Sequence, residues 1–488
     1  MLSLLVFLPL AGAAAVALLP RRHEMGARWL ALATSLACLA LALTLFAAYD
    51  RDGEQFQFVD RHLWLSSQVA PFDVQYALGL DGLSLPLVVL TAFLTTVAVL
   101  VSWGVELRPK EYFAWLLVLE TSLLGVFSAL DLVLFFLFFE LELVPMYFLI
   151  SIWGTGRRIY SAWKYVFFTF FGSAFMLVGI LALGTAAGTF DMRELQAIGP
   201  LRETVLPAEA IFAFLMVGFG VKLPVVPLHT WLPDAHTDAP TAVSVILAGV
   251  LLKMGGYGIL RLCLSILPEV AQQASLFLGA FAATSILYGA LATLMQGDLK
   301  RLIAYSSVSH MGYVLLGASA LGTVGLVGAS MQMFTHGLIT GLLFVMVGLV
   351  YERTHTREIQ NLGGLASHLP YLTVVMVFAG LASLGLPSLA GFVSEATVFL
   401  GTFPEHPALA IMGVLGVLLA AVYILWMVQR AFWGEPQRPW HGLKEKVAWW
   451  ERVPTLALMA AILLIGIYPA VLMDLMELGV KPIAERLA

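Results

Sequence analysis

The sequence has few charged residues. Only 12 % of its 488 residues are Asp, Glu, Lys or Arg, and 60 % are hydrophobic, whereas about a quarter of an ordinary soluble domain is charged. Apolar stretches of about 20 residues recur along the chain, and this length crosses a bilayer core about 30 Å thick. The composition therefore excludes an ordinary soluble fold and predicts an all-α polytopic membrane protein.

Cysteine is also scarce. The two cysteines, Cys38 and Cys263, both lie in apolar stretches. An iron–sulfur cluster or a zinc site needs about four clustered ligands, and no GxGxxG sequence follows a strand and opens a helix. We therefore expect no cofactor on this chain. If the protein takes part in redox chemistry, the electrons travel elsewhere.

Fourteen apolar spans are predicted in a single membrane domain covering residues 1–488. The first is interpreted as a retained span and not a signal peptide, because its positive charges follow the apolar run. The spans lie near 2–19, 28–48, 82–103, 111–129, 131–153, 163–186, 209–231, 239–260, 273–295, 300–321, 325–351, 371–402, 407–430 and 452–473.

The domain divides into four consecutive parts. Residues 1–110 hold three spans and a loop at 49–81 that should pack on the bundle, and residues 431–488 hold the last loop and span. Between them, 111–260 and 261–430 form two halves.

Lysine and arginine predict the orientation. Of the 26, seventeen fall in connections on one side, Lys300 among them, and seven on the other, including Arg261. Lys222 and Lys253 lie inside spans. Because the positive-rich side faces the cytoplasm, we expect both termini on the periplasmic side of a cell inner membrane.

Several ionisable residues lie inside predicted spans, where a charge costs roughly 2.5–3.5 kcal/mol on insertion scales. They are the candidates for a proton pathway: Glu140, Lys222, Lys253, His310, His336 and Glu395.

Glu140 lies in "FFLFFELELVPMYF", where Pro145 leaves the carbonyl of Leu141 without its helical partner. Glu142 is two residues on, so about 200° away around the helix. Both carboxylates therefore cannot face one partner. We expect Glu140 to face inward, because Glu142 is nearer the end of the span.

Lys222 lies in "GVKLPVVPLHTWLPDAH". Pro224 and Pro227 free the carbonyls of Gly220 and Leu223, so a broken helix would offer backbone acceptors beside an ammonium. Displacing a neighbouring carboxylate would change the proton affinity of this lysine. A static ion pair between spans is the alternative.

Lys253 lies in "LLKMGGYG", where Gly255 and Gly256 favour close contact with another helix. A lysine extending to the lipid head groups is the alternative. His310 and His336 lie on consecutive spans, and histidine titrates nearest neutral pH. Either could instead be an ordinary interior histidine. Nearby hydroxyls could hold water between the two rings: Ser306, Ser307, Ser309 and Thr335.

Glu395 follows a second break, because Pro387 frees the carbonyl of Ser383. An inert ion pair is the alternative role for Glu395. Glu120 also lies within a span, but no proline or glycine break accompanies it, and its role stays open.

The two breaks, in spans 7 and 12, lie five spans apart. An odd separation inverts one five-helix unit relative to the other, so spans 4–8 and 9–13 would form inverted repeats. Interrupted helices at matching positions of inverted repeats indicate an ion path near the middle of the membrane.

At these residues the sequence resembles a known family. The stretches "KLPVVPLHTWLPDAHTDAPTAVSVILAGVLLKMGGYG", "FFELELVPMYFLI", "RLIAYSSVSHMGY" and "FTHGLITGLLF" are similar to the M subunit (chain 4) of NADH:quinone oxidoreductase, respiratory complex I. The resemblance covers roughly residues 80–430. Two features favour M over the L and N subunits: the motif "PLHTWLPDAH", and Glu395, where related subunits usually carry lysine.

The resemblance implies a fourteen-helix antiporter-like bundle between L and N neighbours in a membrane arm, moving protons outward. FMN, iron–sulfur clusters and quinone would belong to partner subunits. Glu140 and Lys222 would form the coupling ion pair, Lys253 and the histidines the central relay, and Glu395 the group facing the exit.

Three other interpretations are open. The chain could be a subunit of a multisubunit cation/proton antiporter, which needs the same buried groups. It could be a scaffold with inert buried charges, or the equivalent subunit of a photosynthetic complex in which ferredoxin replaces NADH.

Overall fold

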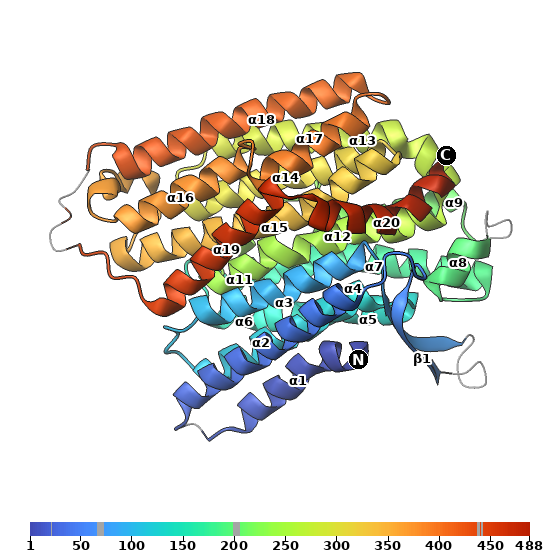
Figure 1. The fold of residues 1–488 in the computed structure, drawn as a ribbon, viewed down its shortest axis with the longest axis horizontal. Helices are drawn as coiled ribbons and strands as arrows, with labels where there is room; N and C mark the ends of the chain where they lie inside the picture. The colour runs from blue at the N-terminus through green and yellow to red at the C-terminus, as the bar shows by residue number, and fades with distance from the viewer. Residues whose placement is uncertain (21, 66–72, 199–204, 437–439, 441–442) are drawn as a thin grey trace.

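The computed structural model describes the chain except residues 21, 66–72, 199–204, 437–439 and 441–442. Its long helices run roughly parallel to one another (Figure 1). The α-helices are α1 Leu2–Leu18, α2 Glu24–Ala48, α3 Ser84–Val101, α4 Pro109–Ser128, α5 Leu132–Leu141, α6 Leu143–Trp153, α7 Arg158–Ala187, α8 Met192–Ile198, α9 Ala208–Lys222, α10 Trp231–Asp238, α11 Thr241–Ile246, α12 Leu252–Gly258, α13 Pro268–Leu294, α14 Leu299–Ser319, α15 Thr323–Thr354, α16 Pro370–Ser383, α17 Ala390–Thr402, α18 Pro407–Val428, α19 Trp449–Ile467 and α20 Ala470–Leu487.

Shorter helical segments continue or connect these helices. The π-helical segments are η1 Leu247–Leu251, η2 Ile259–Leu264 and η5 Gln429–Trp433, and the 3₁₀ turns are η3 Ile359–Asn361 and η4 Leu365–Ser367. Because η1, α12 and η2 follow α11 without a gap, they form one continuous stretch from Thr241 to Leu264.

The predicted fold class is confirmed. Ten helical stretches in the described part of the chain are long and apolar enough to cross a bilayer, and the count of fourteen spans stays a prediction. The last predicted span, 452–473, has the wrong boundaries. The helix stops at Ile467 and restarts at Ala470, because Pro469 has no N–H to continue the helical hydrogen bonding.

A β-hairpin lies where only a packed loop was predicted. Strands β1 (Gln57–Leu65) and β2 (Val74–Leu80) pair antiparallel. The hairpin is attached to the bundle at α1, because Asp60 Oδ2 accepts hydrogen bonds from the amide (3.1 Å) and hydroxyl (2.8 Å) of Ser3. The loop therefore packs on the bundle as expected, with a regular structure that the sequence did not predict.

Matching backbone bridges identify the two repeats. Before α5 and before α14, an aspartate caps the helix: Asp131 accepts from two amides of its own helix and Asp298 from one. In each half the residues on either side of that aspartate exchange hydrogen bonds with the segment that follows the long helix α7 or α15. The four donor–acceptor pairs are Leu132–Phe190 (2.9 Å), Met192–Leu130 (2.8 Å), Leu299–Arg357 (2.9 Å) and Ile359–Gly297 (2.8 Å).

The repeats also share their helix packing. The helix α7 packs against both pieces of the first broken helix, α9 and α10, and α15 packs against both pieces of the second, α16 and α17. The two broken helices therefore occupy equivalent positions. In Figure 1, α8, which follows the first bridge, lies at the end of the bundle where the chain's C-terminus lies.

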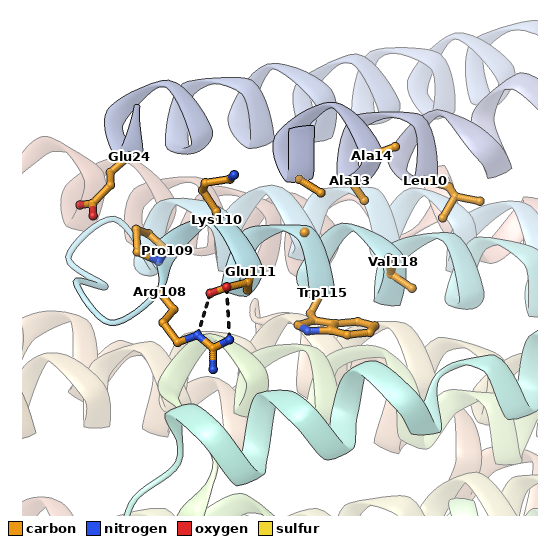
Figure 2. Close-up of a pocket in the computed structure, with 12 residues that line it drawn as sticks. Leu10, Ala13, Ala14, Glu24, Arg108, Pro109, Lys110, Glu111, Trp115 and Val118 are labelled. Atoms are coloured by element: carbon orange, nitrogen blue, oxygen red, sulfur yellow. Dashed lines mark hydrogen bonds and ion pairs between the residues drawn. The ribbon is translucent and has the colours of Figure 1, made fainter. Parts of the chain in front are cut away.

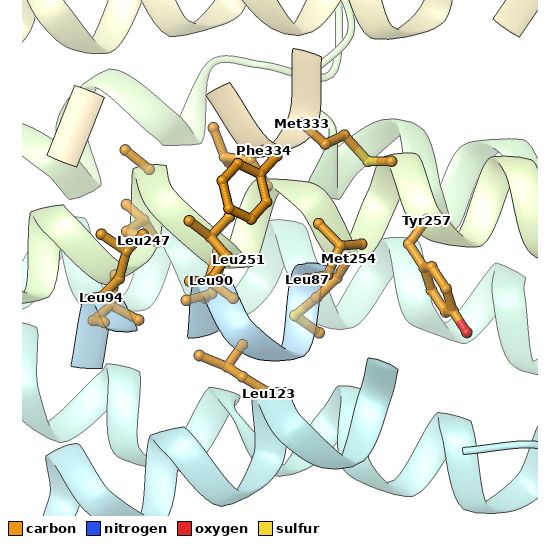
Figure 3. Packing of buried hydrophobic residues seen from close by; sticks show 14 of the residues in the cluster. Leu87, Leu90, Leu94, Leu123, Leu247, Leu251, Met254, Tyr257, Met333 and Phe334 are labelled. Carbon is orange, nitrogen blue, oxygen red and sulfur yellow. The ribbon is translucent and has the colours of Figure 1, made fainter. Parts of the chain in front are cut away.

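The interior between α3 and the segments η1, α12 and α15 is apolar and closely packed. Leu87, Leu90 and Leu94 lie along one face of α3 and meet side chains from η1, α12 and α15 (Figure 3). Lipid is as apolar as these side chains, so close packing holds such helices together. A side chain at Gly249 would collide with Leu94, and one at Gly337 with Leu90.

Two cations that the sequence assigned to connections are buried. Arg261 lies in η2, and its guanidinium forms a 2.5 Å ion pair with Asp81, both side chains being fully buried. Lys300 lies in the first turn of α14 and donates to the carbonyl of Ala239 at 2.5 Å. Their assignment to loops was wrong. The error removes one charge from each predicted side, so the orientation argument is unchanged.

The capping aspartates yield a matched prediction. Asp131→Ala and Asp298→Ala should each lower the free energy of unfolding by about 1 kcal/mol, because an N-terminal helical amide loses its acceptor. Asp131→Asn and Asp298→Asn should lower the free energy of unfolding much less, since asparagine also caps helices. The measurement is denaturant unfolding of the purified full-length chain in detergent. Equal losses for alanine and asparagine would contradict the capping role.

Candidate functional site

The predicted break in span 7 is confirmed. The helix α9 ends at Lys222 and α10 begins at Trp231. Two backbone carbonyls at the break find hydrogen-bond donors within the broken segment. The carbonyl of Gly220 accepts from the amide of Val225 (2.9 Å), and that of Val221 accepts from the indole of Trp231 (2.9 Å). The ammonium of Lys222 thus lies at the C-terminal end of α9, where the helix dipole favours a positive charge.

Lys222 is almost completely enclosed, with 1 % of its surface exposed. Its ammonium donates to Glu142 Oε1 and to the hydroxyl of Tyr165 (3.2 Å), and the Tyr165 hydroxyl donates to Glu142 Oε2. The ring of Phe139 lies 5.2 Å from the ammonium, close enough for a cation–π interaction. A carboxylate, a phenol and an ammonium therefore form one buried group.

The expected partner of Lys222 was wrong. Glu142, and not Glu140, forms the ion pair. Glu142 lies at the junction of α5 and α6 and is fully buried. Glu140 is partly exposed, and its Oε1 has no hydrogen-bond partner in the described residues. The two carboxylates face different directions, as the helical period requires, but the choice between them depended on the junction, which the sequence did not reveal.

Lys253 occupies the centre of the bundle. It is completely buried, which excludes an extension to the lipid head groups. Its ammonium bonds to Nδ1 of His336 at 2.8 Å and to the carbonyl of Ala248. Ala248 belongs to the π-helical segment η1, and single π-helical turns are frequent at functional sites. Lysine and histidine are thereby joined between α12 and α15.

The two histidines continue the line. The rings of His310 and His336 have centroids 5.8 Å apart, and His310 Nδ1 lies 3.3 Å from Glu395 Oε1. On its other side, His310 Nε2 lies 3.4 Å from the hydroxyls of Ser383 and Tyr423. Lys253, His336, His310 and Glu395 therefore form a series of neighbouring ionisable side chains, although His336 Nε2 has no hydrogen-bond partner in the described residues.

The serines predicted to hold water between the histidines do not face that space. Ser306 and Ser307 donate to the carbonyl of Ile303, and Ser309 donates to that of Ile286. Serine on a helix often bonds to the backbone one turn earlier, and this competes with the predicted role. Thr335 instead bonds to Ser394 at 2.8 Å.

A small cavity adjoins the histidines. It measures about 10 Å³ and is lined by both histidines, Gln332, Ser383 and Glu395, among others. A volume of about this size holds roughly one water molecule when polar partners are present. The cavity thus provides room for one water molecule beside the two histidines and Glu395.

The second predicted break is also confirmed. The helix α16 ends at Ser383 and α17 begins at Ala390. Between them Gly385 has φ +77° and Ser388 has φ +78°, so the chain turns through the left-handed region, which glycine adopts readily. Glu395 lies in α17, one face of which lines the cavity, and only 4 % of it is exposed.

Three residues of the site were not predicted: Tyr165, His236 and Lys300. His236 lies on α10, is fully buried, and has no hydrogen-bond partner for either ring nitrogen in the described residues. It lies within electrostatic range of Lys253 and Lys300. A signal for Lys300 was present, because a lysine in the first turn of a helix opposes the helix dipole and needs a partner.

Glu120 lies apart from this line. It is fully buried in α4, and neither carboxylate oxygen has a hydrogen-bond partner in the described residues. It is close enough to Cys38 of α2 to interact electrostatically. Its role therefore stays open, as the sequence left it.

The described residues contain no group of three or more His, Cys, Asp or Glu arranged to hold a metal ion. The polar line from Lys253 to Glu395 instead consists of groups that bind and release protons. Such an arrangement is suited to proton transfer within the membrane.

Comparison with known proteins gives a family match. Residues 129–420 match the family described as "NADH:quinone oxidoreductase/Mrp antiporter, TM". The chain is 41 % identical over 500 aligned residues to NADH-quinone oxidoreductase subunit M of Rhodobacter capsulatus, covering 100 % of this chain and 96 % of that protein.

Solved structures agree in fold. A chain of respiratory complex I from Thermus thermophilus has a TM-score of 0.89 and 32 % identity, with 100 % of both chains covered. A chain of the Mrp complex from Dietzia sp. DQ12-45-1b has a TM-score of 0.86 at 20 % identity, covering 100 % of this chain and 99 % of that one. The second likeness concerns the fold alone.

The observed ion pair predicts unequal effects of the two glutamates. Glu142→Gln should lower the free energy of unfolding by about 3–5 kcal/mol, because it leaves the Lys222 ammonium buried without a carboxylate. Glu140→Gln should lower the free energy of unfolding by about 1 kcal/mol or less. Unfolding of the purified chain measures both, and Glu142→Gln combined with Lys222→Met should recover much of the loss. A larger effect of Glu140→Gln would contradict the pairing.

Proposed function

Because the chain belongs to the NADH:quinone oxidoreductase/Mrp antiporter transmembrane family, we propose that it is a proton-translocating subunit in the membrane arm of an NADH:quinone oxidoreductase. The observation that carries the proposal is the series of buried ionisable groups associated with the two broken helices. Charges inside a membrane are costly and commonly mark ion pathways.

Lys222 is the proposed coupling group. Its ammonium and the carboxylate of Glu142 form a buried ion pair. A movement that separates the pair leaves the ammonium buried without its carboxylate, which is costly, and passing its proton onward removes that cost. The break between α9 and α10 supports such a movement, because Lys222 ends one rigid helix while Glu142 lies at the junction of two others.

The central groups are proposed to pass the proton on. Lys253 and His336 are in direct contact at 2.8 Å, and the neighbouring His310 reaches Glu395. Histidine suits this role because its charge changes near neutral pH. Glu395 is proposed as the last group before the exit. Glu140, the other predicted carboxylate, is retained as a second acceptor near Lys222.

The electron-transfer reaction is proposed to occur in other subunits. FMN, iron–sulfur clusters and quinone would lie there, and quinone reduction would drive the movement at Lys222. The L and N relatives are the proposed neighbours. We propose a bacterial inner-membrane location with both termini on the periplasmic side, as the lysine and arginine distribution indicates.

Loss of the lysine charge tests the role of Lys222. In the intact complex, Lys222→Ala should lower the number of protons pumped per electron, because loss of a positioned proton carrier slows proton transfer by about 100-fold or more. The measurement combines quinone reduction with proton uptake in sealed vesicles. Lys481→Met is the matched control, because Lys481 is an exposed lysine on α20.

An unchanged proton-to-electron ratio in Lys222→Ala, in a complex that still contains the full-length chain, would contradict the proposal. Loss of the chain from the complex would not count as support, so its content is measured in the same preparation.

Co-purification distinguishes the two transport functions. The tagged full-length chain should purify with redox subunits that contain flavin and iron–sulfur clusters, as its 41 % identity to a complex I subunit indicates. Spectroscopy and mass spectrometry of the purified complex measure this. Purification with antiporter chains alone would favour the cation/proton antiporter.

A further inference from the structure

A groove at the edge of the bundle lies away from the series of buried ionisable groups that runs from Lys253 to Glu395. It runs between α1 and α4 and encloses about 950 Å³. Figure 2 shows Leu10, Ala13 and Ala14 on one side, and Trp115 and Val118 on the other. The indole of Trp115 stacks on Phe148 of α6, with centroids 4.9 Å apart, and this contact holds it in place.

The groove is charged at one end and apolar along its length. Glu24, Arg108, Lys110 and Glu111 lie at the end where α4 begins, with Lys110 extending toward α1 and the Arg108–Glu111 pair on the other side of α4 (Figure 2). Leu10 and Val118 lie farther along. A site of this shape suits a molecule with a polar head and an apolar tail. Tryptophan near a helix end is typical of the membrane–water interface.

The length of the groove matches one leaflet. From Pro109 to Val118 a helix rises about 14 Å, at about 1.5 Å per residue, and half of a bilayer core is about 15 Å. The charged end lies where α4 begins, and the end of a membrane-spanning helix is where lipid head groups would lie. An acyl chain therefore fits alongside α1 and α4.

We propose that this groove binds a zwitterionic phospholipid with a primary ammonium, of the phosphatidylethanolamine class. Two acids and two bases line its charged end, so the site complements a head group without net charge. Arg108 and Lys110 would bind the phosphate. Glu24 and Glu111 would accept hydrogen bonds from the ammonium, which a choline head group cannot donate.

The existing contacts leave these groups available. Arg108 donates two hydrogen bonds to Glu111, at 2.9 and 3.2 Å. Both side chains are about half exposed, at 55 % and 44 %, and the guanidinium has further N–H groups to donate. Lys110 donates to the carbonyl of Leu19, and an ammonium has further protons to donate. A phosphate and an ammonium can therefore join the cluster.

Photolabelling tests the proposal. The intact complex is reconstituted in nanodiscs with phosphatidylethanolamine that carries a diazirine on its acyl chain, and labelled peptides are mapped by mass spectrometry. We expect labelling on α1 and α4. Unlabelled phosphatidylethanolamine should compete about tenfold better than phosphatidylcholine or phosphatidylglycerol, the difference expected from one hydrogen bond to a charged group.

Variants provide the controls. Ala14→Trp should abolish labelling of the groove, because Ala14 lines it and is exposed. Leu418→Trp, at a residue 61 % exposed on α18, should leave it unchanged. Equal competition by all three lipids would overturn the head-group assignment. Absent labelling, or cross-linking of position 14 to a neighbouring subunit, would overturn the lipid site.

Discussion

The ammonium of Lys222 is the charge on which the site depends. It lies at the end of α9, enclosed by Glu142, Tyr165 and the ring of Phe139. A buried charge needs both an opposite charge and hydrogen-bond partners. The helix break supplies the room for them, and it places the ammonium where one helix stops. The stability of the site thus depends on this contact.

Internal duplication explains the remainder of the arrangement. Each half caps a helix with an aspartate, bridges it to the segment after a long helix, and breaks one helix beside that long helix. One break carries a lysine and the other is followed by a glutamate. The series from Lys253 through His336 and His310 reaches that glutamate, so it extends from the region of the first break to the region of the second.

The two helix breaks could be predicted from the prolines, which act on the backbone of their own helix. Lys253, His310, His336 and Glu395 could be predicted because each is an ionisable residue inside an apolar span. It did not predict which of Glu140 and Glu142 meets Lys222, since that choice depends on the junction between α5 and α6. It also missed Tyr165 and His236, whose positions follow from packing between distant helices. The hydroxyls of Ser306 and Ser307 were misassigned because their bonds to the backbone compete with contacts across the bundle.

Infrared difference spectroscopy of the intact complex tests the central claim most directly, by comparing the resting state with turnover. If Glu395 takes part in proton transfer as proposed, the spectrum contains a change in a protonated-carboxyl band that disappears in Glu395→Gln. A turnover spectrum that is identical in the native protein and in Glu395→Gln would contradict it.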